Sequence, residues 1–199
     1  MKGKEFGSLV ISALVLALAF GISMSGGFRA FQQPAVLLIV IAISLIAVSL
    51  GFIFHELGHR IVARKFGYFA EYVMWPKGLM IAIGSSLLGF VFAAPGAVMI
   101  YPRATAWGMF IMDRRKIGLI SLAGPATNAG LAVVFLLLDS LYPSLLFALG
   151  MRINVWLAVF NLIPFGPLDG AKIFFWSKSA WLISMAVAGG LFAFQWFSL

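Results

Sequence analysis

Long apolar runs dominate the pattern of hydrophobic and polar positions along this chain. Five of them approach or reach the roughly 20 residues that a helix needs to cross the hydrocarbon layer of a membrane. They cover roughly residues 6–24, 34–54, 117–138, 144–163 and 179–197. A sixth apolar stretch, residues 79–100, is interrupted by Pro95-Gly96. The pattern therefore predicts an all-α polytopic membrane protein with about five to six transmembrane helices.

The first run has a second interpretation, as a secretory signal peptide. Lys2 and Lys4 precede its apolar core, and small residues follow at 23–27, which is the arrangement of a cleavable signal. We expect an uncleaved first span instead, because the chain still carries this segment from Met1 onwards.

Composition agrees with a membrane location. The chain has 199 residues, of which 63% are hydrophobic and 10% charged, whereas soluble domains have about 45–50% apolar and about 25% charged residues. Too few polar side chains remain to cover a water-exposed surface, and disorder requires the opposite composition. There is no cysteine, which excludes disulfides and thiolate metal sites. The length suggests a single domain, 1–199.

The net charge of +8 favours basic loops on an anionic membrane surface, and no nucleic-acid-binding signature is present. Twelve of the 14 Lys and Arg residues fall on one side of the membrane if 79–100 does not cross it. By the positive-inside rule this side is cytoplasmic. We expect a multi-pass cell-membrane protein with a cytoplasmic N-terminus and an external C-terminus. The twelve are Lys2, Lys4, Arg60, Arg64, Lys65, Lys77, Arg103, Arg114, Arg115, Lys116, Lys172 and Lys178.

The same charges indicate whether the interrupted stretch, residues 79–100, crosses the membrane. A single crossing would move the basic cluster at 103–116 outside and remove most of the bias. We therefore expect a re-entrant segment near 79–101 that enters the membrane, turns near Pro95-Gly96 and returns, with strand character at 97–101. Non-helical backbone at membrane depth is tolerated only against protein or a water-filled cavity. This segment is therefore expected to lie against other parts of the protein or to line such a cavity.

Candidate chemistry begins where the second run continues into His55-Glu56-Leu57-Gly58-His59, an H-E-x-x-H motif. Residues four apart on a helix share a face, so both imidazoles can bind one metal ion, and the glutamate can take a proton from water. The chain contains 2 histidines, both in this motif. Because ionisable groups in membrane spans are costly and usually functional, a metal site is favoured over a chance polar pair.

A catalytic zinc site needs a third protein ligand, and here only acids remain. Glu5 is N-terminal, Asp139 falls on the far side of the membrane, and Asp113 is expected to pair with its basic neighbours. Asp169 is the best candidate, because it follows the fourth predicted span on the histidine side. Two alternatives remain: Asp169 as a simple turn residue, and Glu71, in a predicted loop, as a weaker ligand.

Three motifs resemble those of the site-2 protease family of intramembrane metalloproteases. That family carries H-E-x-x-H in one transmembrane helix and N-x-x-P-x-x-x-L-D-G in a later one, and both occur here, at 55–59 and 161–170. Gly124-Pro125-Ala126-Thr127-Asn128 is similar to a G-P-x-x-N/S element between them, and we expect Asn128 to pack or hydrogen-bond near the metal-binding helix. The resemblance covers about residues 34–175, the expected core.

The resemblance implies an intramembrane zinc endopeptidase that cleaves membrane-protein substrates in or near their transmembrane segments, as in regulated intramembrane proteolysis. It implies one zinc ion bound by His55, His59 and Asp169, with Glu56 as general base and an active site open to the cytoplasm. The chain has no room for the PDZ or CBS domains of many relatives, and its segment 79–100 is longer than the sheet-like element of small relatives.

Substrate contacts have open interpretations. Asn161 could donate to a carbonyl oxyanion, or make a helix–helix hydrogen bond or a helix cap. Asn154, two turns earlier, is expected to face the same interior. A strand near 97–101 could bind an unwound substrate by strand addition, or be a structural hairpin.

Two other functions compete with proteolysis. A metal-ion transporter also uses histidine and aspartate in the membrane, but it does not need Glu56 and often shows matched halves, which are not evident here. A catalytically inactive relative that binds membrane clients is disfavoured by the complete set of His55, Glu56, His59 and Asp169.

Overall fold

The computed structural model describes residues 3–101 and 112–198, and these are mostly helical. Lys2 and Arg103, two of the basic residues counted above, lie outside the described residues. The helices are α1 (Gly3–Met24), α2 (Pro34–Lys65), α3 (Pro76–Ser86), α4 (Arg114–Leu141), α5 (Leu145–Asn161), α6 (Asp169–Trp176) and α7 (Lys178–Ser198), with a 3-10 turn at Gly27–Gln32, and the strands are β1 (Phe69–Met74) and β2 (Gly96–Tyr101).

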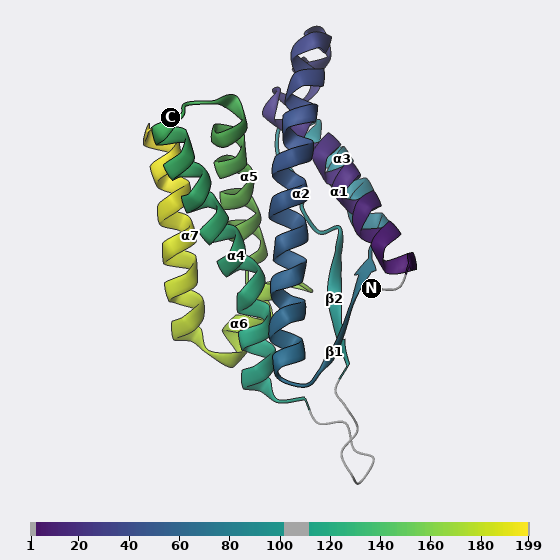
Figure 1. Ribbon diagram of the computed structural model, residues 1–199, viewed down its shortest axis with the longest axis vertical. Helices are drawn as coiled ribbons and strands as arrows, with labels where there is room; N and C mark the ends of the chain where they lie inside the picture. The colour runs from purple at the N-terminus through teal and green to yellow at the C-terminus, as the bar shows by residue number, and fades with distance from the viewer. Residues whose placement is uncertain (1–2, 102–111, 199) are drawn as a thin grey trace.

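Helix α2 lies at the centre of the bundle (Figure 1). It packs against α1 on one side and against α4 and α5 on the other, and α7 contacts α5 and α4. In the described part of the chain, α1, α2 and α4 are long and apolar enough to cross a membrane, and α5 is a shorter apolar helix. Four predicted runs thus correspond to α1, α2, α4 and α5, and the fifth corresponds to α7.

Helix α2 continues beyond the predicted span, which ended at residue 54, and runs to Lys65. Pro34 occupies its first turn, where the missing N–H is no loss, and Gly67, with φ of 79°, allows the chain to leave the helix. Arg60, counted above among the loop cations, is instead in this helix and buried. It pairs with Glu5 of α1, which ties α1 to the helix that carries the H-E-x-x-H motif.

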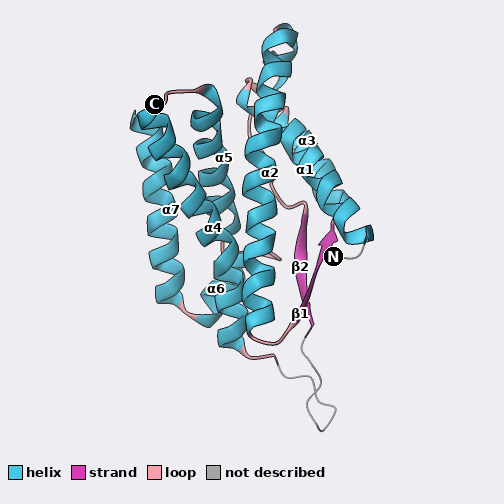
Figure 2. Ribbon diagram, in the orientation of Figure 1, coloured by secondary structure: helices cyan, strands magenta, loops and turns pink. Residues whose placement is uncertain are grey.

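Two strands correct the prediction of an all-α chain (Figure 2). They pair antiparallel, with Phe69 opposite Tyr101 and Met74 opposite Gly96. β2 confirms the strand character expected at 97–101, whereas β1 lies where we predicted a loop. Ala70 of β1 is buried and Phe69 is exposed, as expected for a sheet with one face on the core.

The chain reverses direction between α3 and β2 at residues 87–89, not at Pro95-Gly96 as predicted. The N–H groups of Leu88 and Gly89 donate to the carbonyls of Ser85 and Ser86, and Gly89 supplies the positive φ, 87°, that this turn requires. Pro95 instead leads into β2, where its carbonyl accepts the N–H of the residue after β1. Proline has no N–H to lose at a strand entrance.

Asp113 is the N-cap of α4 rather than the predicted partner of basic side chains. Its Oδ1 accepts hydrogen bonds from the backbone N–H groups of Arg115 and Lys116. A carboxylate in this place satisfies orphan N–H groups and complements the helix dipole.

Candidate metal centre

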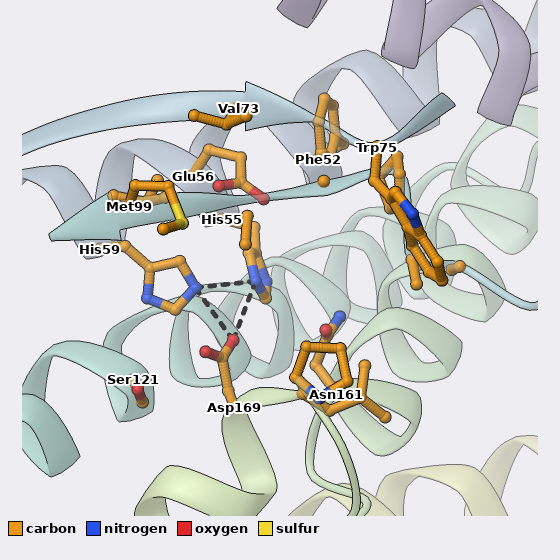
Figure 3. A pocket seen from close by; sticks show the side chains of 18 of the residues that line it. Phe52, His55, Glu56, His59, Val73, Trp75, Met99, Ser121, Asn161 and Asp169 are labelled. Carbon is orange, nitrogen blue, oxygen red and sulfur yellow. Dashed lines mark hydrogen bonds and ion pairs between the residues drawn. The ribbon is translucent and has the colours of Figure 1, made fainter. Parts of the chain in front are cut away.

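Three side chains from two helices converge at one point of the bundle (Figure 3). His55 and His59 are one turn apart on α2, and Asp169 begins α6. The Nε2 atoms of the two histidines are 3.0 Å apart. Oδ2 of Asp169 lies 3.4 Å from Nε2 of His55 and 3.0 Å from Nε2 of His59. All three residues are buried, and they are the three that the sequence singled out as ligands.

The three donor atoms fit one zinc ion. Donors about 2.0–2.2 Å from a tetrahedral zinc ion lie about 3.3–3.6 Å from one another, and the observed separations of 3.0–3.4 Å are at or just below this range. Two imidazole nitrogens and one carboxylate oxygen are typical of a catalytic zinc site, which uses three protein ligands and keeps the fourth position for water or substrate.

The second nitrogen of each imidazole is held by an oxygen. Nδ1 of His55 lies 2.5 Å from Oδ1 of Asn128, and Nδ1 of His59 lies 2.7 Å from the carbonyl oxygen of Ile120. Both oxygens accept, so each Nδ1 carries the proton and each Nε2 offers its lone pair to the centre. The expected contact of Asn128 with the metal-binding helix is therefore confirmed, with His55 as its partner.

Glycine lets α4 approach the imidazoles closely. A β-carbon on Gly124 would lie 2.6 Å from Cε1 of His55 and closer still to Nε2 of His59, which is far inside van der Waals contact. On α2, a β-carbon on Gly58 would lie 2.8 Å from Oγ1 of Thr127. The two glycines bring the helices together so that Asn128 reaches the ligand side chain.

The loop between α5 and α6 orients the side chain of Asp169. Gly166 has φ of 61°, and a β-carbon on Gly170 would collide with the carbonyl of Leu162, so both turns need glycine. Nζ of Lys172 donates to Oδ1 of Asp169 over 3.3 Å, which leaves Oδ2 facing the histidines. Burial raises the pKa of the Asp169 carboxyl, but its interactions with the two histidines and Lys172 outweigh burial and hold that pKa well below its ordinary value.

Glu56 lies beside the ligands with one oxygen free. The residue is 7% exposed, and its Oε2 has no hydrogen-bond partner within the described protein. Buried carboxylate oxygens normally have a partner. Because Glu56 also lines the same cleft as the three ligands, its carboxylate is well placed to take a proton from water there.

A cleft of about 330 Å³ opens onto the ligands. Its lining includes β2 and the segment before it, together with Leu157, Asn161 and Pro167. Nδ2 of Asn161 donates to the carbonyl of Leu157, one turn earlier in its own helix. The Asn161 side chain lines the cleft, and its hydrogen bond is within α5 rather than between helices.

The other acids lie elsewhere. In the described part of the chain, Glu71 pairs in β1 opposite Met99 and is neither in the ligand group nor among the cleft-lining residues. Asp139 accepts the N–H of Ser144 at the junction of α4 and α5. Sequence reasoning did not find the pairing of Asn154 with Asn128, in which Asn154 accepts a hydrogen bond from Asn128. The only sequence signal for this pairing was a polar side chain inside an apolar helix.

Comparison with known proteins gives the class of this chain. A protein of Methanocaldococcus jannaschii named "Putative zinc metalloprotease" is 41% identical over 186 residues, which is 90% of this chain and 88% of that protein. A "Zinc metalloprotease" of the same organism is 30% identical over 142 residues, 66% of this chain but 33% of the longer relative. No family model matches the chain. No solved structure matches it either. The chain belongs to this family of zinc metalloproteases.

Proposed function

We propose that the protein is a membrane-embedded zinc endopeptidase of the site-2 protease type, which cleaves membrane proteins in or near their transmembrane segments. One observation carries the proposal: a His-His-Asp ligand group and a free carboxylate oxygen lie together, and two of the ligands belong to a helix long and apolar enough to span a membrane. A soluble protease has no need to place its metal ligands on such a helix.

The residues divide the chemistry among them. His55, His59 and Asp169 would hold a zinc ion, which would supply Lewis acidity towards water and a peptide carbonyl. The Glu56 carboxylate takes the proton of the attacking water and delivers it to the leaving amine. Asn161, in the wall of the cleft, donates to the oxyanion that develops on the carbonyl.

The substrate is proposed to bind as an extended segment. A transmembrane helix hides its carbonyl groups in its own hydrogen bonds, so it must unwind before water can attack. β2 lines the cleft along residues 96–100, and β1 pairs with it. A substrate strand could be added to this sheet and lie across the ligands. The alternative, a purely structural hairpin, predicts no dependence of cleavage on β2.

The chain path supports five spans and a re-entrant segment. The turn after α2 and the starts of α4 and α7 lie at one end of the bundle, and the α1–α2 and α4–α5 connections lie at the other (Figure 1). Because Phe69 pairs with Tyr101, segment 69–101 returns to the end from which it starts. We propose that this end, which carries most of the basic residues, faces the cytoplasm.

Two competing functions remain distinguishable. A transporter would pass the ion along a series of ligands, but the described residues contain one ligand group, with an unpartnered carboxylate beside it. An inactive client-binding relative would not need that carboxylate. Both alternatives predict no peptide-bond hydrolysis.

The decisive experiment uses the purified full chain in detergent with a panel of single-span membrane proteins and an unfolded soluble protein. We expect cleavage in or next to the spans, loss of cleavage with a chelator, and recovery on adding zinc. Equal cleavage of the soluble protein would indicate an ordinary metalloprotease. No cleavage, combined with zinc uptake by reconstituted vesicles, would favour the transporter.

Orientation can be tested because the chain lacks cysteine. Single cysteines at Lys65, Arg115 and Lys178 should react with a membrane-impermeant thiol reagent from the cytoplasmic side. A cysteine at Arg29, in the α1–α2 connection, is the matched control and should react from the outside. Labelling of Lys65→Cys and Arg115→Cys from opposite sides would contradict the re-entrant path of the segment between them.

A further inference from the structure

Two buried asparagines connect the ligand His55 to a third helix. Oδ1 of Asn128 on α4 accepts from Nδ1 of His55, 2.5 Å away. Nδ2 of Asn128 donates to Oδ1 of Asn154 on α5 over 3.0 Å. Nδ2 of Asn154 donates in turn to the carbonyl of Gly150 over 2.9 Å. Both asparagines are 0% exposed, so water does not compete for these bonds.

The chain of hydrogen bonds has a fixed direction. A carbonyl oxygen can only accept, so the bond to Gly150 requires the amino group of Asn154 on that side and turns its oxygen towards Asn128. That oxygen requires the amino group of Asn128, which turns the oxygen of Asn128 towards His55. Nδ1 of His55 is then the donor, and Nε2 keeps its lone pair for the metal.

The helices are shaped to hold this amide pair. A β-carbon on Gly51 of α2 would lie 2.7 Å from Oδ1 of Asn154, so glycine makes room for the amide between α2 and α5. The carbonyl of Gly51 also accepts from Nδ2 of Asn128 over 3.1 Å. Both N–H groups of Asn128 are therefore used, and its orientation is determined from two sides.

The two histidines differ in the kind of acceptor that faces Nδ1. Nδ1 of His59 donates to the backbone carbonyl of Ile120, which can only accept a hydrogen bond. Nδ1 of His55 donates to a side-chain amide, which places an acceptor or a donor opposite the ring depending on its own neighbours. The tautomer of His55 is thus the one that depends on distant side chains.

We propose that Asn154 is a positioning residue for the metal centre: through Asn128 it keeps His55 in the tautomer that binds metal. The proposal rests on the zinc site of the proposed function and adds a residue that contacts neither metal nor substrate. It is distinct from a packing role, because it requires a hydrogen-bond acceptor at position 154 and not merely a side chain of this size.

The test measures zinc affinity of the purified full chain by competition with a chromophoric chelator. Asn128→Leu removes the direct acceptor and should weaken zinc binding about 10–100-fold, as outer-shell changes do. Asn154→Leu should weaken it about 10-fold, since the Gly51 carbonyl still holds one N–H of Asn128. Asn154→Asp should stay within about 3-fold, because a neutral carboxyl donates to Gly150 and accepts from Asn128.

Cobalt supplies a second readout. The visible absorption of Co²⁺ bound to Asn154→Leu should differ from that of the wild-type complex, whereas Asn154→Asp should restore it. Thr127→Val is the matched control, because the hydroxyl of Thr127 bonds within its own helix; both affinity and spectrum should be unchanged. If Asn154→Leu does not fold, Asn154→Ala removes the same acceptor without added bulk.

The outcomes separate the two proposals. Wild-type zinc affinity in the apolar variants, or equal losses in Asn154→Leu and Asn154→Asp, would overturn the positioning role and leave the protease proposal standing. A wild-type protein that binds zinc and shows the expected variant series, but cleaves no membrane protein, would overturn the protease proposal alone. A wild-type protein without zinc affinity would overturn both.

Discussion

Glu56→Gln should abolish proteolysis while leaving zinc in place. The substitution keeps the size of the side chain and removes its basicity, so the attacking water has no group to take its proton. We expect the cleavage rate to fall about 10²- to 10⁴-fold, the usual contribution of a general base. Zinc per protein molecule should match the wild type, because Glu56 stands outside the His-His-Asp ligand group. Elemental analysis and single-turnover cleavage measure the two quantities.

The matched control for this change is Glu71→Gln. It makes the same chemical substitution in β1, at a position outside the cleft-lining residues of the described structure, and should cleave at nearly the wild-type rate. Substantial proteolysis by Glu56→Gln would assign the base to another residue, with Glu71 the first to test. A loss of zinc in Glu56→Gln would instead mean that this carboxylate helps to hold the metal.

The convergence of the three candidate ligands was predictable because its signals are local or carried by recognisable motifs. His55 and His59 are placed by helical periodicity alone, and Asp169 follows a Pro-rich segment after an apolar helix. β1 was missed, although Phe69-Ala70-Glu71-Tyr72-Val73-Met74 is rich in strand-forming residues, because the segment that follows the H-E-x-x-H helix was interpreted as a loop. That strand-forming composition was the usable signal.

Long-range pairs could not be predicted. Glu5 was set aside as an N-terminal acid, yet it pairs with Arg60 and accepts the N–H of Tyr72. Nothing in the local sequence links these residues, because only the packing of α1 on α2 and β1 brings them together. The same holds for Asn128 and Asn154: each was visible as a polar residue in an apolar helix, but their pairing depends on how closely α4 and α5 approach α2.

In the sequence, a turn residue and a metal ligand both explain Asp169. The structure favours the ligand interpretation. The Asp169 carboxylate faces the imidazoles of His55 and His59 and the ammonium of Lys172. Among the described residues, it accepts no hydrogen bond from a backbone N–H. A turn or capping aspartate would accept such a bond.

Asp169→Asn should therefore lose zinc and activity together. Asparagine keeps the shape and would serve equally well in a turn, but it lacks the negative charge that a carboxylate gives the metal. Because a neutral amide oxygen binds zinc much more weakly than a carboxylate, zinc affinity should fall by more than the roughly 10–100-fold seen when only a residue supporting a ligand is changed, and cleavage should fall with it. Asp139→Asn, at the other end of α4, is the matched control and should retain both. Elemental analysis and cleavage rates decide: normal zinc and activity in Asp169→Asn would establish the turn interpretation and make Glu71 the next ligand to test.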